Sequence, residues 1–199
     1  MTLPINVDPA SKKVSVDDSY FEDLNEKQAK ELRTQIDQLN SLNRYMVGLN
    51  SDVPPTPEHI TQQVTTQVNK LKETGTLAVK QDKLKEAIKH FSLAIDMALK
   101  RPPWEATQYT IEELCKCLGP RADAYMSQNL WPDAYCDAAL LVLLKPMDAK
   151  NHYRKGRCLE SVRKYNEAKA AYTAGLSISP EDSDLKASLK EVNELLKKN

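Results

Sequence analysis

The stretch RKGRCLESVRKYNEAKAAYTAGLSISP, from Arg154 to Pro180, decides the fold of this chain. Small and aromatic residues recur in it at helical spacing, and a proline closes it. The small positions are Gly156, Ala168 and Gly175, and the aromatic ones are Tyr165 and Tyr172. Small side chains let two helices approach closely, and a proline ends a helix because it cannot continue the backbone hydrogen bonds. The stretch therefore predicts a pair of antiparallel helices.

The same pattern occurs twice more, upstream of this stretch. Tyr165, Ala168, Tyr172 and Pro180 align with Trp131, Ala134, Ala138 and Pro146, each at an offset of 34 residues (for example 165−131). A further copy contains Leu84, Ala87 and Phe91, at an offset of 47 (134−87). A period of about 34 residues is typical of the tetratricopeptide repeat, whose helical hairpins stack into a solenoid. The 13 extra residues (47−34) fall near Lys100–Leu114 and predict a loop plus an extended first helix.

The end of the chain predicts a capping helix for this array. The segment Asp182–Lys198 carries an apolar stripe at spacings of three and four, formed by Leu185, Leu189, Val192 and Leu196. A composition with only 5 glycines and 6% aromatic residues also favours helices throughout. We therefore predict an all-α tetratricopeptide solenoid of three repeats plus a capping helix over residues 58–199.

The first 50 residues have a different character. Leu3–Val16 contains two short alternating runs around a turn sequence, which predicts a β-hairpin. Tyr20–Leu49 is amphipathic and predicts one helix. Its expected buried face is formed by Leu24, Leu32, Ile36, Leu39 and Leu42. A hairpin with one helix makes a poor autonomous core, so we expect residues 1–50, a small α+β segment, to bind a partner. Residues 51–57 are proline-rich and predict a linker, after which a helix is expected to start at Glu58.

Composition and motifs exclude several classes of protein. Lysine plus arginine and aspartate plus glutamate each number 28, and this balance argues against bulk nucleic-acid binding. The longest apolar run, Ala138–Leu144, is too short for the roughly 20 residues that cross a bilayer, so we expect no direct membrane insertion. No signal peptide opens the chain, which predicts a cytosolic protein with reduced thiols.

The sequence also contains no recognisable catalytic motif. Nucleotide-binding, nucleophile-elbow and zinc-protease signatures are all missing, and Cys115 and Cys117 are closer together than zinc ligands usually are. We expect the four cysteines to be inert core residues. The prediction is a protein without catalytic activity, cofactor or metal.

Basic side chains recur on the expected first helices of two repeats. Lys150 and Arg154 are four residues apart and therefore share one face of a helix. Lys72 precedes Gly75 by three residues, on the face expected to look into the same concave groove. Arginine can hold a carboxylate bidentately, and lysine acts as a mobile point charge. Three cations facing one groove predict a receptor for carboxylates, and such a groove can exist at zero net charge.

These three cations resemble three positions of the dicarboxylate clamp in chaperone-binding tetratricopeptide domains. The resemblance implies binding of the acidic C-terminal tail, ending Glu-Glu-Val-Asp, of cytosolic heat-shock chaperones of the seventy-kilodalton class. Two further clamp positions, usually asparagine, are Thr76 and Pro120 in this chain. Thr76 still offers a hydroxyl, whereas Pro120 offers no donor and Asp123 adds repulsion. Arg121 and Arg157 are auxiliary candidates for the same site.

The chain also resembles one particular family over nearly its whole length. The segment KLKEAIKHFSLAIDMALKRPPWEA (Lys83–Ala106), the N-terminal hairpin and the proline-rich linker are similar to the small cytosolic tetratricopeptide subunit of the fungal Sec translocon complex. The resemblance implies a peripheral protein at the cytosolic face of the endoplasmic reticulum. Its N-terminal segment would grip a membrane-anchored translocon subunit, and its groove would receive chaperones for post-translational translocation. The alternatives are a purely structural scaffold subunit and a soluble co-chaperone that is not attached to the membrane.

Overall fold

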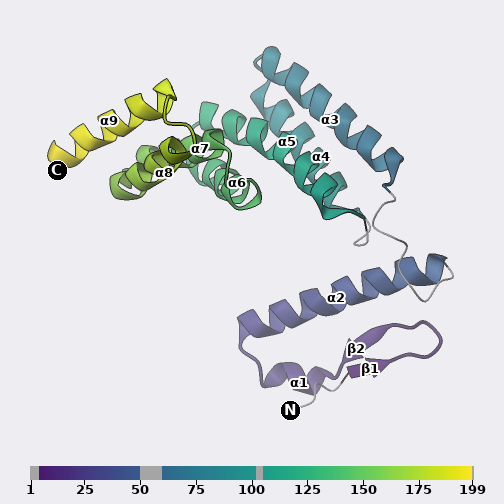
Figure 1. Cartoon of the computed structure of the whole chain (residues 1–199). Helices are drawn as coiled ribbons and strands as arrows, with labels where there is room; N and C mark the ends of the chain where they lie inside the picture. Colours follow the sequence, from purple (N-terminus) through teal and green to yellow (C-terminus); the bar gives the residue numbers. More distant parts are fainter. Residues whose placement is uncertain (1–4, 50–59, 102–104, 199) are drawn as a thin grey trace. The chain divides into compact units, whose positions relative to one another are not determined.

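A computed structural model describes residues 5–49, 60–101 and 105–198 of the protein (Figure 1). Within these ranges the chain forms two strands and nine helices. They are β1 (Ile5–Val7), β2 (Val14–Val16), α1 (Asp18–Glu22), α2 (Glu26–Leu49), α3 (Gln62–Lys80), α4 (Leu84–Leu99), α5 (Thr107–Ser127), α6 (Trp131–Leu144), α7 (Ala149–Ser161), α8 (Tyr165–Ile178) and α9 (Ser183–Lys198). The elements β1 to α2 belong to one compact unit and α3 to α9 to a second. The predicted linker, residues 51–57, lies outside the described residues.

The helices α3 to α9 form the predicted solenoid of three hairpins and a capping helix. Each helix packs on the next one along the chain, in the pairs α3/α4, α5/α6 and α7/α8, and α9 packs on α8 (Figure 1). The first helices also contact one another, α3 with α5, α5 with α7 and α7 with α9, whereas α4, α6 and α8 lie further apart. The first helices therefore line the inner, concave side of the solenoid. The predicted fold class, including the small N-terminal α+β segment, is confirmed.

Glycine–aromatic pairs set the distance between the two helices of a repeat. A Cβ atom on Gly75 would lie 2.8 Å from the Phe91 ring, and one on Gly156 would lie 2.2 Å from the Tyr172 ring. Each ring lies on the glycine of its own repeat, and Tyr172 also joins a cluster with Leu185 of α9. Because these glycines have no side chain, the two buried rings can pack directly against the first helix of their repeat.

The helix pairs are joined by turns of one type. Asp82, Asn129 and Arg163 have positive φ angles of 57°, 60° and 61°. In each turn the next residue donates its backbone N–H to the carbonyl five positions before it, as in Lys164 to Leu159 at 2.9 Å. This is the Schellman motif, which satisfies the last carbonyls of the first helix and reverses the chain.

The first helix of the middle repeat is extended, as the irregular spacing predicted. It begins at Thr107 and spans 21 residues, whereas α7 spans 13. Pro120 lies inside α5 without ending it. Proline has no N–H, so the hydrogen bond that residue 120 would donate to the previous turn is missing. Helix α3 begins at Gln62, and the predicted start of the repeat domain at Glu58 lies outside the described residues.

The N-terminal unit contains the predicted hairpin, packed on α2. Strands β1 and β2 are antiparallel, with Ile5 opposite Val16. The side chain of Asp8 organises the turn by accepting the backbone N–H groups of Ala10 and Ser11 at 3.1 and 3.2 Å. Asn40 of α2 binds both the N–H and the carbonyl of Val14, at 2.7 and 2.8 Å. Its side-chain amide therefore occupies the free edge of β2 and forms the two hydrogen bonds that a neighbouring strand would otherwise form there.

The predicted single helix over residues 20–49 is wrong, because the chain forms two helices there. The break lies at residues 23–25. The Asn25 side chain accepts the N–H of Gln28 at 2.9 Å, and the Gln28 side chain accepts the N–H of Asn25 at 3.2 Å. This reciprocal capping box starts a new helix and is more favourable than continuing the first one.

The N-terminal unit has little core of its own. None of the residues from Ile5 to Leu49 is buried. Of the expected buried face, Leu39 is wrong because half of its surface is exposed, and the other four positions are only half-buried. Ile5 and Val7 of β1 and Val47 of α2 are also more than half exposed.

No helix in the described parts of the chain is both long enough and apolar enough to cross a bilayer.

Candidate functional site

Three arginine–carboxylate pairs brace the described part of the solenoid. Arg101 binds Glu113 of α5 and Arg121 of α5 binds Asp137 of α6, in both cases through two nitrogen atoms at 2.6 to 2.9 Å. Arg154 of α7 binds Asp123 of α5 in the same bidentate way, with both distances 2.7 Å. Such fork-shaped contacts are directional as well as strong. Two of the three therefore fix α5, the central first helix, against its neighbours α6 and α7.

Arg154 lies deep at the contact between α5 and α7. Only 8% of its side chain is exposed. A Cβ on Gly119 of α5 would lie 3.4 Å from its guanidinium, so this glycine leaves the space that the group occupies. The Nη1 atom also donates to Asn151 Oδ1 at 3.3 Å, and Asn151 is held by the carbonyls of Leu141 and Lys145. The guanidinium is thus held firmly in place.

The predicted cation on the first repeat also lies near α5. Lys72 is half-buried, and its ammonium donates to Asn69 Oδ1 at 3.3 Å. Burial raises the pKa of the Cys117 thiol of α5 to about 11, and the charge of Lys72 partly offsets this rise. Helix α3, which carries Lys72, contacts α5. The Thr76 hydroxyl donates to the Lys72 carbonyl at 2.9 Å, so it is already used within its own helix.

Lys150, the first predicted cation of the third repeat, is exposed. It lies in the first turn of α7, whose N-terminus is capped by the Asp148 carboxylate accepting the Lys150 N–H at 3.0 Å. The side chain is open to solvent, one helical turn before Arg154. Lys150 and Arg154 therefore combine an exposed, mobile charge with a buried, fixed one.

The two auxiliary candidates are engaged with other groups of the chain. Arg121 is held by Asp137 and also donates to Ser92 Oγ of α4 at 2.9 Å. Arg157 lies 3.8 Å from the Glu160 carboxylate, which in turn accepts the Tyr172 hydroxyl at 2.5 Å. Pro120 is half-buried in α5, one residue after the glycine that touches Arg154.

Sequence reasoning missed that Asp123 is the partner of Arg154. The two residues are 31 positions apart, and no local pattern links them. It also missed Asn151, which supports the guanidinium from α7. Helix spacing places Pro120 and Asp123 on one face, but the contact of that face with Arg154 depends on the stacking of α5 and α7.

The cysteines differ from one another in burial. Burial raises the pKa of Cys158, like that of Cys117, to about 11. Cys136 is exposed, so the expectation that every cysteine is a core residue is wrong for this one. It lies on the outer side of α6, where the repeat needs no small residue. Among the described residues no cluster of histidine, cysteine or acidic side chains could hold a metal ion.

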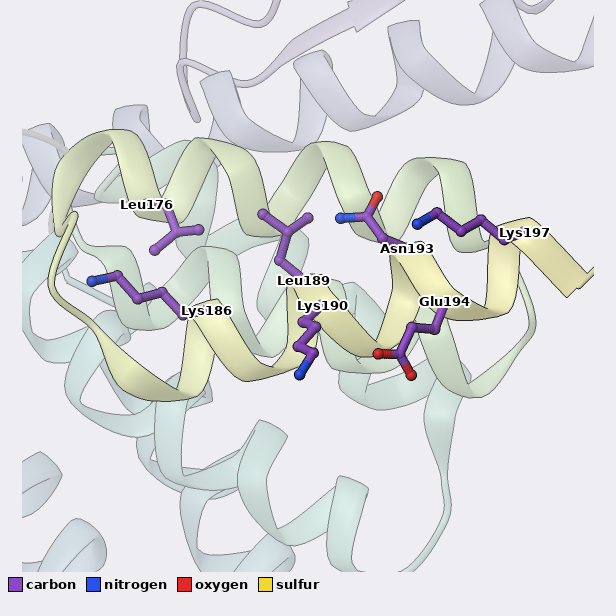
Figure 2. Close-up of a pocket in the computed structure, with 7 residues that line it drawn as sticks. All are labelled: Leu176, Lys186, Leu189, Lys190, Asn193, Glu194 and Lys197. Carbon is purple, nitrogen blue, oxygen red and sulfur yellow. The ribbon is translucent and has the colours of Figure 1, made fainter.

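A shallow hollow of about 380 Å³ lies between α8 and α9 (Figure 2). Leu176 and Leu189 form its apolar part, and the rest of its lining is polar. The polar residues are Lys186, Lys190, Asn193, Glu194 and Lys197. A solenoid needs such a polar outer face on its last helix, since a further repeat would otherwise stack there. The hollow therefore marks the capped end of the array.

Helical hairpins that stack in this way define a tetratricopeptide-repeat protein. The sequence profile of the tetratricopeptide repeat matches residues 149–182, which form the third hairpin. A relative at the level of the whole chain is the translocation protein SEC72 of Saccharomyces cerevisiae. It is 34% identical over 160 residues, which cover 79% of this chain and 81% of that protein.

Two further comparisons agree with this relative. The ER protein translocation subcomplex subunit sec67 of Schizosaccharomyces pombe is 35% identical over 129 residues, covering 64% of this chain and 67% of that protein. A chain in the cryo-EM structure of the S. cerevisiae Sec complex matches with a TM-score of 0.79 and 30% identity, covering 98% of both chains. The chain therefore belongs to the family of small tetratricopeptide subunits of the fungal Sec translocon. The family places the chain at the translocon of the endoplasmic reticulum.

One similar structure contains a bound peptide. The first tetratricopeptide domain of Spaghetti (RPAP3), bound to the HSP90 peptide SRMEEVD, matches 70% of this chain and 98% of that domain. Its sequence identity is 25% and its TM-score is 0.56.

Proposed function

We propose that the protein is a non-enzymatic adaptor that docks cytosolic heat-shock chaperones at the translocon. It does so by binding their acidic C-terminal tail in the concave groove of the solenoid. The proposal is supported by predicted cations on two first helices, α3 and α7, which both contact α5. Lys72 is on α3, Arg154 binds Asp123 of α5 from α7, and Lys150 is one turn before Arg154.

The three cations have different roles in this proposal. Lys150 is exposed and reaches a carboxylate in solvent, and it forms the first contact with an incoming tail. Lys72 is half-buried and attracts a second carboxylate across α5. Arg154 provides a fixed guanidinium, which suits a carboxylate held at defined geometry. Exposed charge pairs are weak individually, so the tail should bind with modest affinity.

The chemistry of the ligand is supported by the similar RPAP3 domain, whose bound peptide ends in two glutamates, a valine and an aspartate. By analogy, the ligand of this chain is the corresponding tail of a chaperone of the seventy-kilodalton class. The analogy rests on the shared fold and the basic groove, and it concerns the class of ligand only.

The N-terminal unit has a separate role in the proposal. We infer that residues 1–50 bind a membrane-anchored translocon subunit, which would hold the protein at the membrane. The exposed side chains of Ile5, Val7 and Val47 support this inference, because a unit without buried residues gains its missing core from a partner. The match to a Sec complex subunit extends over this unit as well.

The proposal is tested by calorimetry with a peptide ending Glu-Glu-Val-Asp. Lys150→Ala should weaken binding about three- to tenfold, the scale of one exposed charge pair. Lys169→Ala is the matched control, because it removes an exposed lysine from α8 on the outer layer of the solenoid. Equal affinities of the wild type and Lys150→Ala would exclude Lys150 from the site.

A scaffold without tail binding is the second candidate function. Two observations favour it: Pro120 offers no donor, and Arg154 already holds a carboxylate of its own chain. A pull-down with the tail peptide at low and moderate salt separates the two functions. Capture at low salt supports the adaptor, whereas no capture in either condition supports the scaffold.

A further inference from the structure

The pairing of Arg154 with Asp123 places a carboxylate of the chain itself on the cation that a clamp would offer to its ligand. Both oxygen atoms of Asp123 are engaged, with Nε and Nη2 of Arg154, at 2.7 Å. This is the geometry in which an arginine binds a free carboxylate. In the structure the bidentate face of Arg154 is therefore occupied.

The two partners of this pair are unequally buried. The Arg154 side chain is 8% exposed, whereas the Asp123 side chain is 44% exposed. In the pair of Arg121 and Asp137 the carboxylate is the more buried partner, at 6% against 18%. A carboxylate that only braces two helices lies inside, as Asp137 does. Asp123 instead lies on the solvent side of its arginine, where a ligand carboxylate would arrive.

The other contacts of Arg154 also indicate that Asp123 is the partner that can be displaced. Asn151 holds Nη1 from α7, and Gly119 leaves space for the guanidinium on α5. The arginine is therefore fixed without Asp123, and the carboxylate is the group that is able to move. When Asp123 leaves, it enters water rather than a buried site, so its release is less unfavourable than that of a buried anion.

We propose that Asp123 is an internal competitor of the acidic tail. It occupies the fork of Arg154 and is displaced when a carboxylate of the tail binds there. This inference rests on the proposed function, because it concerns the same groove. An attached competitor acts at a high effective concentration, of the order of millimolar or above. Asp123 therefore lowers the affinity of the groove and restricts binding to ligands whose other carboxylates reach Lys72 and Lys150.

A double-mutant cycle tests this role by calorimetry with the Glu-Glu-Val-Asp peptide and the full chain. Asp123→Asn should tighten binding about three- to tenfold. It removes the carboxylate that occupies the Arg154 guanidinium while keeping the shape of the side chain. The gain should disappear in the Arg154→Ala background. If Asp123 acted only as a nearby negative charge, the gain would persist or grow there, since the charge would then lack its partner. That result would overturn the proposal.

Glu112→Gln is the matched control, because it removes an exposed carboxylate elsewhere on α5. It should leave the affinity unchanged. Thermal melts show whether each variant is folded, and Asp123→Asn should lower Tm by only a few degrees.

In a titration of the wild type followed by NMR, the Arg154 Nε–H resonance should move, because the tail replaces Asp123 as its acceptor. An unmoved resonance despite tail binding overturns the inference alone, whereas no binding by any folded variant overturns the proposed function as well.

Discussion

At the scale of single residues, the separation of the two helices in a repeat depends on a missing methyl group. Gly156 faces the Tyr172 ring, and Gly75 faces the Phe91 ring. Both rings are fully buried. Because packed interiors have few voids, a ring in this position cannot move without displacing its neighbours. These glycines are therefore required for packing, not for backbone freedom.

Substituting these glycines by alanine should destabilise the protein in a graded way. Gly156→Ala places a Cβ 2.2 Å from the Tyr172 ring and should lower the free energy of unfolding by about 1–3 kcal/mol. Gly75→Ala, at 2.8 Å from Phe91, should have a smaller effect. Gly48→Ala is the control, because nothing lies within 4 Å and a helical alanine is favourable. Denaturant titrations of the three variants measure this order, and an unchanged Gly156→Ala variant would show that Tyr172 is free to shift.

The thiols provide a second prediction at this scale. Burial raises the pKa of Cys117 and Cys158 to about 11, so at pH 8 only about one thiol in a thousand is ionised at either position. The thiolate is the reactive form, and its fraction rises only as the pH approaches the raised pKa. Iodoacetamide at pH 8 should therefore label the exposed Cys136 first, and the two buried thiols only after unfolding. Mass spectrometry checks the order, and early labelling of Cys158 would contradict it.

At the scale of secondary structure elements, the spacing of apolar and small residues predicted most of the helices. The repeat period indicated the helices α4 to α8, and the apolar stripe from Leu185 to Leu196 indicated α9, since both patterns record which faces are buried. The break at Asn25 was not predicted, because the apolar stripe continues across it while a reciprocal side-chain cap ends the helix. The role of Asn40 was also not predictable. It depends on a strand 26 residues away, and no pattern within α2 indicates it.

Asn40 should hold the hairpin to α2. Asn40→Ala removes two hydrogen bonds to the backbone of Val14 and leaves the edge of β2 to water. We expect a loss of about 1–2 kcal/mol of local stability, because each such bond contributes roughly 1 kcal/mol. Hydrogen exchange of residues 5–16 measures the effect, with Thr34→Ala as the control, since its hydroxyl bonds only within α2. Equal protection in both variants would mean that other contacts hold the hairpin.

At the scale of the whole molecule, a sequence pattern can predict basic residues on the first helices but not which of them already have a partner. Lys72, Lys150 and Arg154 were identified by their spacing from the repeat pattern. The pairing of Arg154 with Asp123 follows only when α5 and α7 are stacked, and helix periodicity does not contain that information. Periodicity defines which side chains share a face, whereas tertiary packing decides which of them already have a partner.

The two kinds of charge in the solenoid should respond differently to salt. Lys150 is exposed and Lys72 half-buried, so their attraction for a tail is screened as the Debye length falls from about 14 to 4 Å between 50 and 500 mM salt. The tail affinity should then fall about tenfold. The bracing pairs of Arg101 with Glu113 and Arg121 with Asp137 are largely shielded from solvent, and ions screen them far less. The Tm of the free protein should therefore change by only a few degrees over the same range. Calorimetry and thermal melts at both salt concentrations compare the two responses. A tail affinity that does not depend on salt would mean that apolar contacts, rather than these lysines, hold the tail in the groove.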